Sequence, residues 1–215
     1  MPQRAVAIGC DRSPPLVDIC AQRGFEVLVA DAVQAPFRSG CADVALSVAV
    51  LHHLSTHARR VAACAELLRV VRADGGAVFL QAWAQEQGEG SRRSFLSQDV
   101  FVPWCLARKF ASGTDAEVEA AGGVIDPARG AVVFQRFCHV YRRGELEELL
   151  AEAAAGLGIT VVGGAAQEQP AVGADQEQHG GVSGFRARSP VAVLRFEAAW
   201  YDKDNWCVIA RRHVE

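Results

Sequence analysis

The sequence predicts an α/β fold with a parallel sheet, and three observations support this prediction. Short apolar runs alternate with amphipathic helical segments over residues 5–83, as in strand, helix and strand units with right-handed crossovers. Several of these runs end abruptly on a polar residue, as at Asp11, Asp31 and His52. Half of the 215 residues are hydrophobic, so we expect one domain with a sizeable core.

The ends of the first elements are marked by polar and turn residues. An apolar strand over residues 5–10 closes on Asp11, and Ser13 is placed to cap a helix that starts with two prolines and ends at Gly24. A second strand is predicted over residues 25–30 and closes on the second aspartate. Each aspartate also has an ordinary interpretation, as a helix cap or a turn residue.

The most informative stretch is an apolar strand over residues 43–51 that ends in His52 and His53. Buried parallel strands have such uninterrupted apolar runs, and ligands bind beyond their carboxyl ends. The histidine pair therefore marks a candidate site. The alternative is a pair of helix-entry residues whose rings bind backbone carbonyls.

A helix and a fourth strand follow this pair. Ser55 or Thr56 is predicted to cap the helix, with its apolar residues packed inward and its arginines outward. A tight turn over residues 73–76 leads into a strand over residues 77–83.

Regular patterning stops after this strand. Residues 84–98 and 111–131 are predicted to be loops or insertions, because neither has a hydrophobic period. Between them lies an apolar island over residues 100–104, whose Trp104 could stack on a nucleobase or pack in the core.

The last third of the chain contains four predicted elements. They are a helix over 144–155, a strand over 159–162, a disordered segment over 163–190, and a closing hairpin of strands 191–200 and 206–210.

Composition limits the classes of function. A net charge of -3 provides no general attraction to nucleic acid, and arginine pairs such as Arg92 and Arg93 are more often solvated than binding. The seven cysteines include no C-x-x-C motif, so neither a disulfide framework nor a zinc module is indicated. His53 and His57 lack an acidic or cysteine partner, and no metal site is predicted. No 18-residue apolar span occurs, so we expect no membrane segment.

Several short stretches resemble one family. They are Gly9–Ser13, Ala30–Ala32, Pro36–Phe37, Ser47–Thr56, Trp83–Gln87, Ser97–Val100, Val102–Trp104, His139–Glu147 and Asn205–Ile209. Together they are similar to the class I S-adenosylmethionine-dependent tRNA methyltransferases that esterify wobble carboxymethyluridine, including the methyltransferase part of the AlkB-type tRNA hydroxylase. The Pro-Trp, His-Val-Tyr and Asn-Trp-Cys motifs are more specific than acids at strand ends.

The resemblance implies a single methyltransferase-like domain over residues 1–215, with a Rossmann-like class I sheet and a C-terminal antiparallel hairpin. S-adenosylmethionine would be the cofactor. Asp11 would hold its ribose hydroxyls, Asp31 would bind its adenine amino group, and Ala32 would supply a backbone amide.

The resemblance also places four residues, as the catalytic set, at the substrate pocket: Arg12, His52, His53 and Asn205. The substrate carboxylate has a reference pKa of about 4 and is already ionised at neutral pH, so no general base is needed. The histidines would then orient the substrate. Arg12 would grip the carboxylate in a bidentate fork, with a surface ion pair as the alternative for this residue. Asn205 has a plain turn as its alternative.

We also expect two departures from the family. Its first strand and glycine-rich cofactor loop would precede residue 4, so the chain is expected to be N-terminally truncated and its sheet to lack them. Because that strand is central, its loss leaves buried backbone groups unpaired at about 1–3 kcal/mol each. Residues 151–190 match nothing in the family and are interpreted as an insertion or a misread segment.

The function implied by the resemblance is methyl transfer to the carboxylate of wobble 5-carboxymethyluridine in tRNA. Two alternatives stay open: a catalytically inactive pseudo-methyltransferase that keeps a tRNA- or protein-binding surface, and a methyltransferase that acts on a small carboxylic acid. The implied partners are tRNA and a small zinc-binding activator subunit. From the scattered cysteines and the interrupted apolar pattern of the first thirty residues we expect a location in the cytoplasm, with the nucleus as a further possibility.

Overall fold

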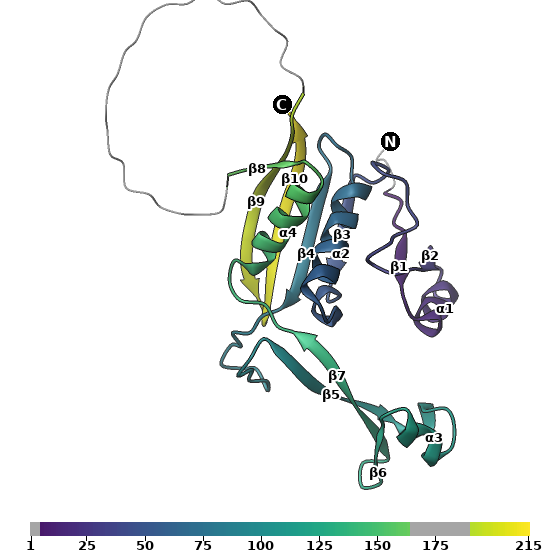
Figure 1. Cartoon of the computed structure of the whole chain (residues 1–215). Helices are drawn as coiled ribbons and strands as arrows, with labels where there is room; N and C mark the ends of the chain where they lie inside the picture. The colour runs from purple at the N-terminus through teal and green to yellow at the C-terminus, as the bar shows by residue number, and fades with distance from the viewer. Residues whose placement is uncertain (1–4, 164–189) are drawn as a thin grey trace, which may run out of the picture.

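The computed structural model describes residues 5–163 and 190–215, and its strands form three sheets (Figure 1). The predicted disordered segment over 163–190 therefore lies outside the described residues, apart from its two end positions. The largest sheet has five strands in the order β3-β4-β10-β9-β8. Their bounds are β3 Val44–Val48, β4 Ala77–Trp83, β10 Asn205–Val214, β9 Ala192–Asp202 and β8 Thr160–Val162.

This sheet is mixed. β3 pairs parallel with β4, and β8 pairs parallel with β9, whereas β10 runs antiparallel to both of its neighbours. The closing hairpin predicted from the sequence is confirmed by the pairing of β9 with β10, and the strand predicted over residues 77–83 is β4. The parallel pairing predicted from the alternating elements over residues 5–83 is found between β3 and β4.

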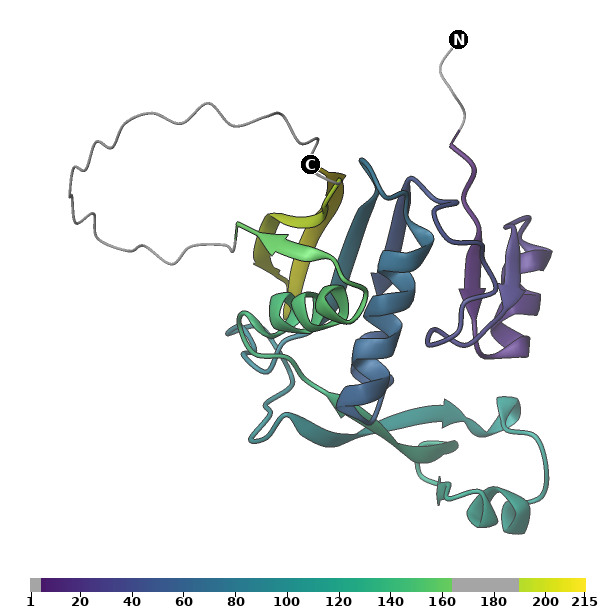
Figure 2. The ribbon, with the colours of Figure 1, turned by 45° about the horizontal axis from the view of Figure 1, so that its top comes forward.

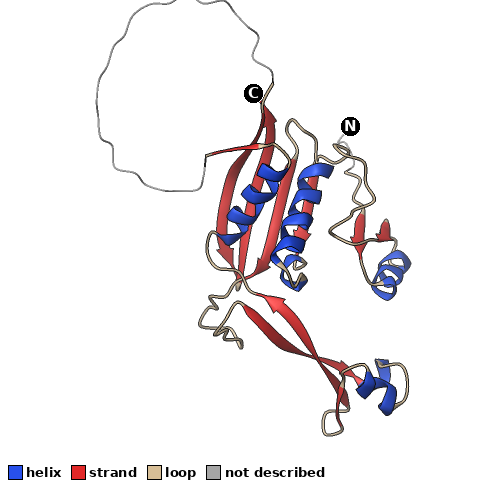
Figure 3. Ribbon diagram, in the orientation of Figure 1, coloured by secondary structure: helices blue, strands red, loops and turns tan. Residues whose placement is uncertain are grey.

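Two helices cover one face of the five-stranded sheet, α2 (His57–Val70) and α4 (Glu145–Gly156) (Figure 3). Thr56 caps α2, because its hydroxyl accepts a hydrogen bond from the Arg59 amide at 3.3 Å. The first turn of α4 carries three glutamates, which interact favourably with the positive end of the helix dipole. None of the described helices is long and apolar enough to cross a membrane.

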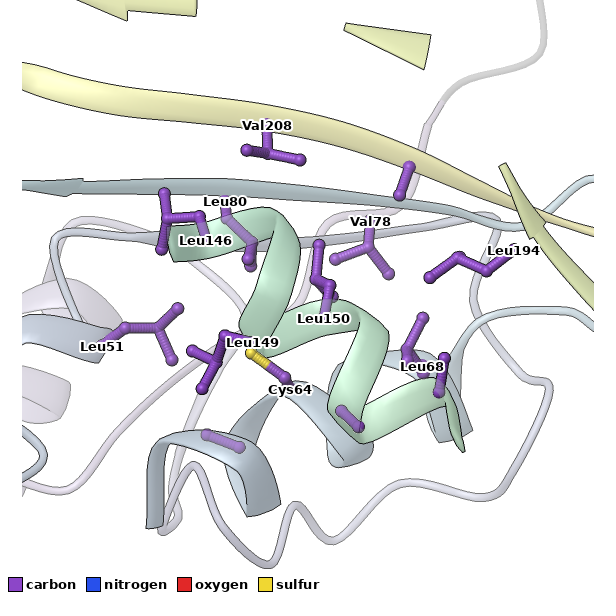
Figure 4. Close-up of a cluster of buried hydrophobic side chains, with 14 of the residues drawn as sticks. Leu51, Cys64, Leu68, Val78, Leu80, Leu146, Leu149, Leu150, Leu194 and Val208 are labelled. Carbon is purple, nitrogen blue, oxygen red and sulfur yellow. The ribbon is translucent and has the colours of Figure 1, made fainter. Parts of the chain in front are cut away.

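The core lies between these helices and the sheet, as Figure 4 shows. Leu68 from α2, Leu150 from α4 and Leu80 from β4 are fully buried there, and each such side chain contributes roughly 1.5–3 kcal/mol. The turn into β4 needs glycine at position 76, since a Cβ there would lie 2.4 Å from the Arg72 carbonyl oxygen. The apolar residues of β4 and the glycine turn before it therefore place this strand in the core.

One orientation predicted for α2 was wrong. The arginines of this helix were expected to point outward, but Arg60 is buried and donates from Nη1 to the Leu54 carbonyl at 3.0 Å. This contact ties α2 back to the segment that precedes it, which is why a charged side chain is tolerated at an inward position.

The N-terminal elements form a unit of their own. β1 (Gly9–Asp11) and β2 (Val27–Val29) pair parallel, and α1 (Pro14–Gln22) connects them. Both strands are shorter than predicted, and no described strand pairs with the free edge of β3. Figure 2 shows this unit beside α2 and apart from the five-stranded sheet. The link between them is the loop over residues 34–42, which hydrogen-bonds to α2.

A third sheet makes an arm that extends from the end of the main sheet (Figure 1). Its order is β5-β7-β6, and every pairing is antiparallel. The bounds are β5 Asp99–Ala107, β7 Ala131–His139 and β6 Val124–Asp126, with α3 at Asp115–Ala120. The segment 111–131, expected to be a loop or insertion, thus contains α3 and β6. The apolar island around Trp104 is part of β5, not a separate piece of core.

Candidate functional site

The histidine pair is positioned by a sharp change of direction at the carboxyl end of β3. Ala49 has a φ of 57°, in the left-handed region that a residue with a Cβ seldom adopts. The chain then enters a 3-10 helix, Leu51–His53, which Leu51 anchors by full burial. Backbone strain of this kind gathers at functional sites, and here it brings His52 to the end of β4 and His53 to β7.

His52 lies in a dry, stacked environment. It is 1% exposed, and its ring stacks on Trp83 with centroids 4.6 Å apart and planes 23° apart. The Trp83 amide donates a long hydrogen bond of 3.5 Å to His52 Nδ1, which assigns the ring proton to Nε2. Burial, followed by the neighbouring His53 and Arg136, lowers the pKa of His52 to about 3. His52 is therefore neutral and a very weak base.

His53 joins the site to the arm. Its Nδ1 lies 3.5 Å from the Phe137 carbonyl oxygen and 3.8 Å from Cys138 Sγ, both on β7. Burial and the Arg136 charge lower the pKa of His53, although the Phe137 carbonyl opposes this shift. The alternative interpretation of the pair, with rings bound to backbone carbonyls, is thus met at His53.

Two arginines that come from distant parts of the chain meet at Trp83. Arg93 Cζ lies 4.1 Å from the centroid of the indole, and Arg136 Cζ lies 5.7 Å from it. Neither forms an ion pair within 4 Å among the described residues. The Arg136 Nε is buried without a hydrogen-bond partner in the described chain, at a cost of about 1–3 kcal/mol. The site is therefore cationic at neutral pH.

Asn205 is brought next to Trp83 by the register of β10 with β4, in which the two residues are paired. Its side-chain amide nitrogen donates to the carbonyls of Asp202 and Lys203, at 3.2 and 2.8 Å. Asn205 thus holds the β9–β10 turn, as the turn interpretation expected, and does so at the edge of the histidine site.

The other predicted residues lie on or near the β1–β2 unit. Asp11 ends β1, and its Oδ1 accepts from the Ser13 amide at 2.8 Å. Ser13 is the N-cap of α1, but its side chain makes no capping hydrogen bond, so the cap predicted for it is not formed. Asp31 accepts from the Val33 amide at 3.1 Å and pairs with Arg59 at 3.4 Å. Arg12 is exposed and makes no ion pair or side-chain hydrogen bond with the described residues.

The two groups of predicted residues differ in their surroundings. A cavity of about 280 Å³ lies beside Asp11 and is lined by Gly9, Cys10, Leu16, Val17, Cys20 and Val27. His52 stacks on Trp83, His53 lies edge-on against His52, and Asn205 is paired with Trp83 in the β4–β10 ladder. None of these three residues lines that cavity. No group of three or more His, Cys, Asp or Glu side chains is arranged to hold a metal ion within residues 5–163 and 190–215.

Sequence reasoning missed three residues of the site. Trp83 ends a predicted strand beside the histidine-bearing one, and that position was a usable signal. Arg93 belongs to an arginine pair, and such pairs are more often solvated than binding. Arg136 had no signal, because only the fold of the arm brings residue 136 to residues 52 and 83.

The comparisons of the sequence with known proteins agree on one family. Residues 2–79 match the family model described as a methyltransferase domain. The chain is 35% identical over 209 residues to a tRNA (carboxymethyluridine(34)-5-O)-methyltransferase of Schizosaccharomyces pombe, covering 96% of this chain and 72% of that protein. A protein of the same name from Xenopus tropicalis is 37% identical over 178 residues. The chain spans only 28% of that protein and 35% of its Macaca fascicularis counterpart.

Solved structures support the fold. The CcbJ methyltransferase of Streptomyces caelestis matches with a TM-score of 0.53 at 12% identity, covering 95% of this chain and 73% of that one. An S-adenosylmethionine-dependent methyltransferase of Clostridium acetobutylicum matches with a TM-score of 0.50 at 7% identity, covering 95% and 74%. The fold is therefore that of class I methyltransferases, and with the sequence identities above, the chain belongs to the family of tRNA (carboxymethyluridine(34)-5-O)-methyltransferases.

Proposed function

We propose that this chain is a methyltransferase that forms the methyl ester of wobble 5-carboxymethyluridine in tRNA. One observation carries the proposal: the site at Trp83 combines two guanidinium groups that form no ion pair among the described residues with two histidines whose pKa values are lowered. Such a site attracts an anion and lacks a strong base. A carboxylate acceptor requires both properties, because it is ionised already at neutral pH.

The cofactor proposed is S-adenosylmethionine, and the residues present fit its nucleoside part. Asp11 and Asp31 follow neighbouring parallel strands and so lie at one edge of the β1–β2 sheet, where acids hydrogen-bond ribose and base. Asp11 keeps one carboxylate oxygen without a partner in the described chain, and Ala32 offers a backbone amide next to Asp31. When bound, the cofactor supplies an electrophilic methyl group on a sulfonium.

On the substrate side we assign orienting roles to His52 and His53. A histidine with a pKa near 3 remains neutral, and its Nε2–H can donate to a uracil carbonyl or carboxylate without competing for a proton. Arg12 is proposed as a substrate contact because its guanidinium is exposed and unengaged among the described residues. Asn205 is proposed as a positioning residue that fixes the turn beside Trp83.

The partner proposed for the arm is the tRNA itself. The exposed fractions are 45% for Trp104 and 70% for Phe101, both on β5, and unstacked bases of RNA loops stack on such aromatic side chains. Trp104 rests against Phe134 with centroids 6.0 Å apart, so its ring is held in place. A Trp104→Ala variant should bind tRNA more weakly, with the Phe101→Ala variant for comparison. Unchanged affinity for tRNA in both variants would exclude the arm as a tRNA-binding surface.

A small zinc-binding activator subunit is proposed as a second partner. The support is a row of exposed apolar side chains on one side of β3, at Val44, Leu46 and Val48. Such a contiguous row is typical of an interface. Size-exclusion chromatography of the chain with and without the candidate subunit tests the pairing, and Leu46→Glu should abolish co-elution. The location proposed is the cytoplasm, with the nucleus as the alternative.

The test of the activity is transfer of a labelled methyl group to tRNA from cells that lack the wobble ester. The expected product is labelled tRNA that loses its label in mild alkali, as an ester does. Labelling of small carboxylic acids but never of tRNA would instead establish the small-acid alternative. Cofactor binding measured by calorimetry without any transfer would favour the inactive alternative.

A further inference from the structure

Two guanidinium groups meet at one aromatic ring although they come from different parts of the fold. Arg93 lies in the loop after β4, and Arg136 lies on β7 of the arm. Both guanidinium centres lie within 5.7 Å of the Trp83 centroid. The contact with the π face stabilises each cation, but it does not neutralise either charge.

Neither charge has an ion-pair partner among the described residues. Both nearby histidines are neutral, and no carboxylate lies within 4 Å of either arginine in the part of the chain that the structure describes. Asp204 is an acid close enough to feel the charge of Arg93, which is a minor cause of its lowered pKa after the hydrogen bonds from the Gly88 amide and the Tyr201 hydroxyl. Its carboxylate already accepts from the Gly88 amide at 2.8 Å and from the Tyr201 hydroxyl at 2.9 Å.

We propose that Arg93 and Arg136 form a clamp that binds the carboxylate of the substrate beside Trp83. The inference rests on the proposed function and deepens it, since it names the group that selects an acidic nucleobase side chain. A guanidinium donates two parallel hydrogen bonds to a carboxylate, and two guanidiniums from separate elements can hold both of its oxygens. Neither arginine forms an ion pair among the described residues, so no carboxylate of the described chain competes for this fork.

The clamp also accounts for product release. The acid carries a full negative charge and the methyl ester carries none, so only the acid gains the charge-assisted hydrogen bonds. The site therefore holds the acid more tightly than the ester. In this arrangement the arginines at Trp83, and not Arg12, provide the main grip on the carboxylate.

The experiment compares the affinity of the full chain for two nucleosides, 5-carboxymethyluridine and its methyl ester, by NMR titration. The wild type should bind the acid about 10-fold or more tightly than the ester. Arg93→Gln and Arg136→Gln should each weaken binding of the acid about 10-fold and leave the ester unchanged. Arg136→Lys keeps the charge but loses the fork, so its affinity for the acid should lie between that of the wild type and that of Arg136→Gln.

The matched control is Arg92→Gln, which removes an equal charge from the exposed residue next to Arg93 and should not change the preference. Thermal unfolding separates a misfolded Arg136 variant from a specific loss, and Arg93 is exposed, so Arg93→Gln is expected to fold. The clamp is overturned if the wild type binds both nucleosides equally or neither. It is also overturned if the preference survives in both variants, or if Arg12→Gln alone removes it.

Failure of the clamp and failure of the proposed function give different results. Methyl transfer to tRNA together with an acid preference that is independent of Arg93 and Arg136 removes the clamp and leaves the function. An arginine-dependent acid preference without any methyl transfer leaves the clamp and removes the function.

Discussion

The imidazole of His52 stacks on the indole of Trp83, with the ring centroids 4.6 Å apart. This contact joins the carboxyl ends of β3 and β4, which are neighbouring parallel strands. It keeps His52 dry and neutral, and it holds the indole in place for the two guanidinium groups near it. The stack is therefore the fixed point around which the other groups of the site are arranged.

His52 should make the protein less stable below pH 6.5. Because burial lowers the pKa of His52 from 6.5 to about 3, the unfolded chain binds a proton in that interval and the folded chain does not. The free energy of unfolding should fall by about 1 kcal/mol per pH unit as pH drops from 6.5 toward 3, and be fully regained above 6.5.

Urea unfolding at pH 7.5 and pH 5.5 measures this loss. His52→Phe keeps a ring to stack on Trp83 but cannot bind a proton, so its unfolding free energy should depend less on pH. A variant with the same pH dependence as the wild type would show that His52 is not the group responsible.

Arg69 should hold the loop that follows β2. Its Nη1 donates to the Phe37 carbonyl at 2.8 Å, its Nη2 donates to the Ala35 carbonyl at 3.0 Å, and its Nε pairs with Glu66 at 2.7 Å. Replacing it by methionine should cost about 2 kcal/mol, because charge-assisted bonds to partly buried acceptors are lost.

Hydrogen exchange would locate the effect of Arg69→Met, with faster exchange expected at the amides of residues 34–42. Arg72→Met is the control, just beyond the end of the same helix, since the Arg72 pair with Asp43 is exposed and worth at most about 1 kcal/mol. Equal losses of stability in the two variants would contradict the role given to Arg69.

His139 should fix the base of the arm. Its Nδ1 contacts Asp99 on β5 at 2.6 Å, and its Nε2 contacts Glu145 on α4 at 2.7 Å. The pKa of Glu145 is lowered although burial raises it, because the hydrogen bonds from His139, the Arg142 amide and Gln98 outweigh burial.

His139→Phe should therefore raise the pKa of Glu145 and destabilise the protein by about 2 kcal/mol. The Glu145 carboxyl carbon can be titrated by NMR in both proteins. His57→Phe is the control, because the His57 pair with Glu152 at 2.7 Å is more than half exposed. An unchanged titration of Glu145 in His139→Phe would show that the hydrogen bond from His139 does not lower the pKa of Glu145.

Tyr141→Phe should leave stability unchanged or raise it. The tyrosine is fully buried, and its hydroxyl has no hydrogen-bond partner in the described chain. Removing an unpaired buried hydroxyl while keeping the ring should gain up to about 1 kcal/mol. Thermal unfolding measures the change. A loss of more than about 1 kcal/mol would reveal that the hydroxyl has a partner.

Local signals in the sequence predict the elements whose structure depends on residues close together in the chain. Thr56 caps a helix because its hydroxyl is close to the amide three residues on, and β4 follows a turn that only glycine at position 76 can make. The closing hairpin is predictable for the same reason, since its two strands are adjacent in sequence. The histidine pair at the end of β3 was found by the same strand pattern.

The arm and the arginine pair could not be predicted in this way. β5 and β7 pair across a long insertion, so no local pattern reports their register. Arg136 meets Trp83 only after that pairing forms. Arg60 shows the same limit, because its burial depends on a carbonyl exposed by the preceding segment and not on the helix period.

Two synthetic anticodon stem-loops test the central claim most directly, one with 5-carboxymethyluridine and one with the neutral 5-carbamoylmethyluridine at the wobble position. Each is incubated with the chain, its candidate activator and S-adenosylmethionine, and then analysed by mass spectrometry. The account predicts that the acid loop gains one alkali-labile methyl group and the amide loop gains none. Equal methylation of both loops, or no methylation of the acid loop, would contradict it.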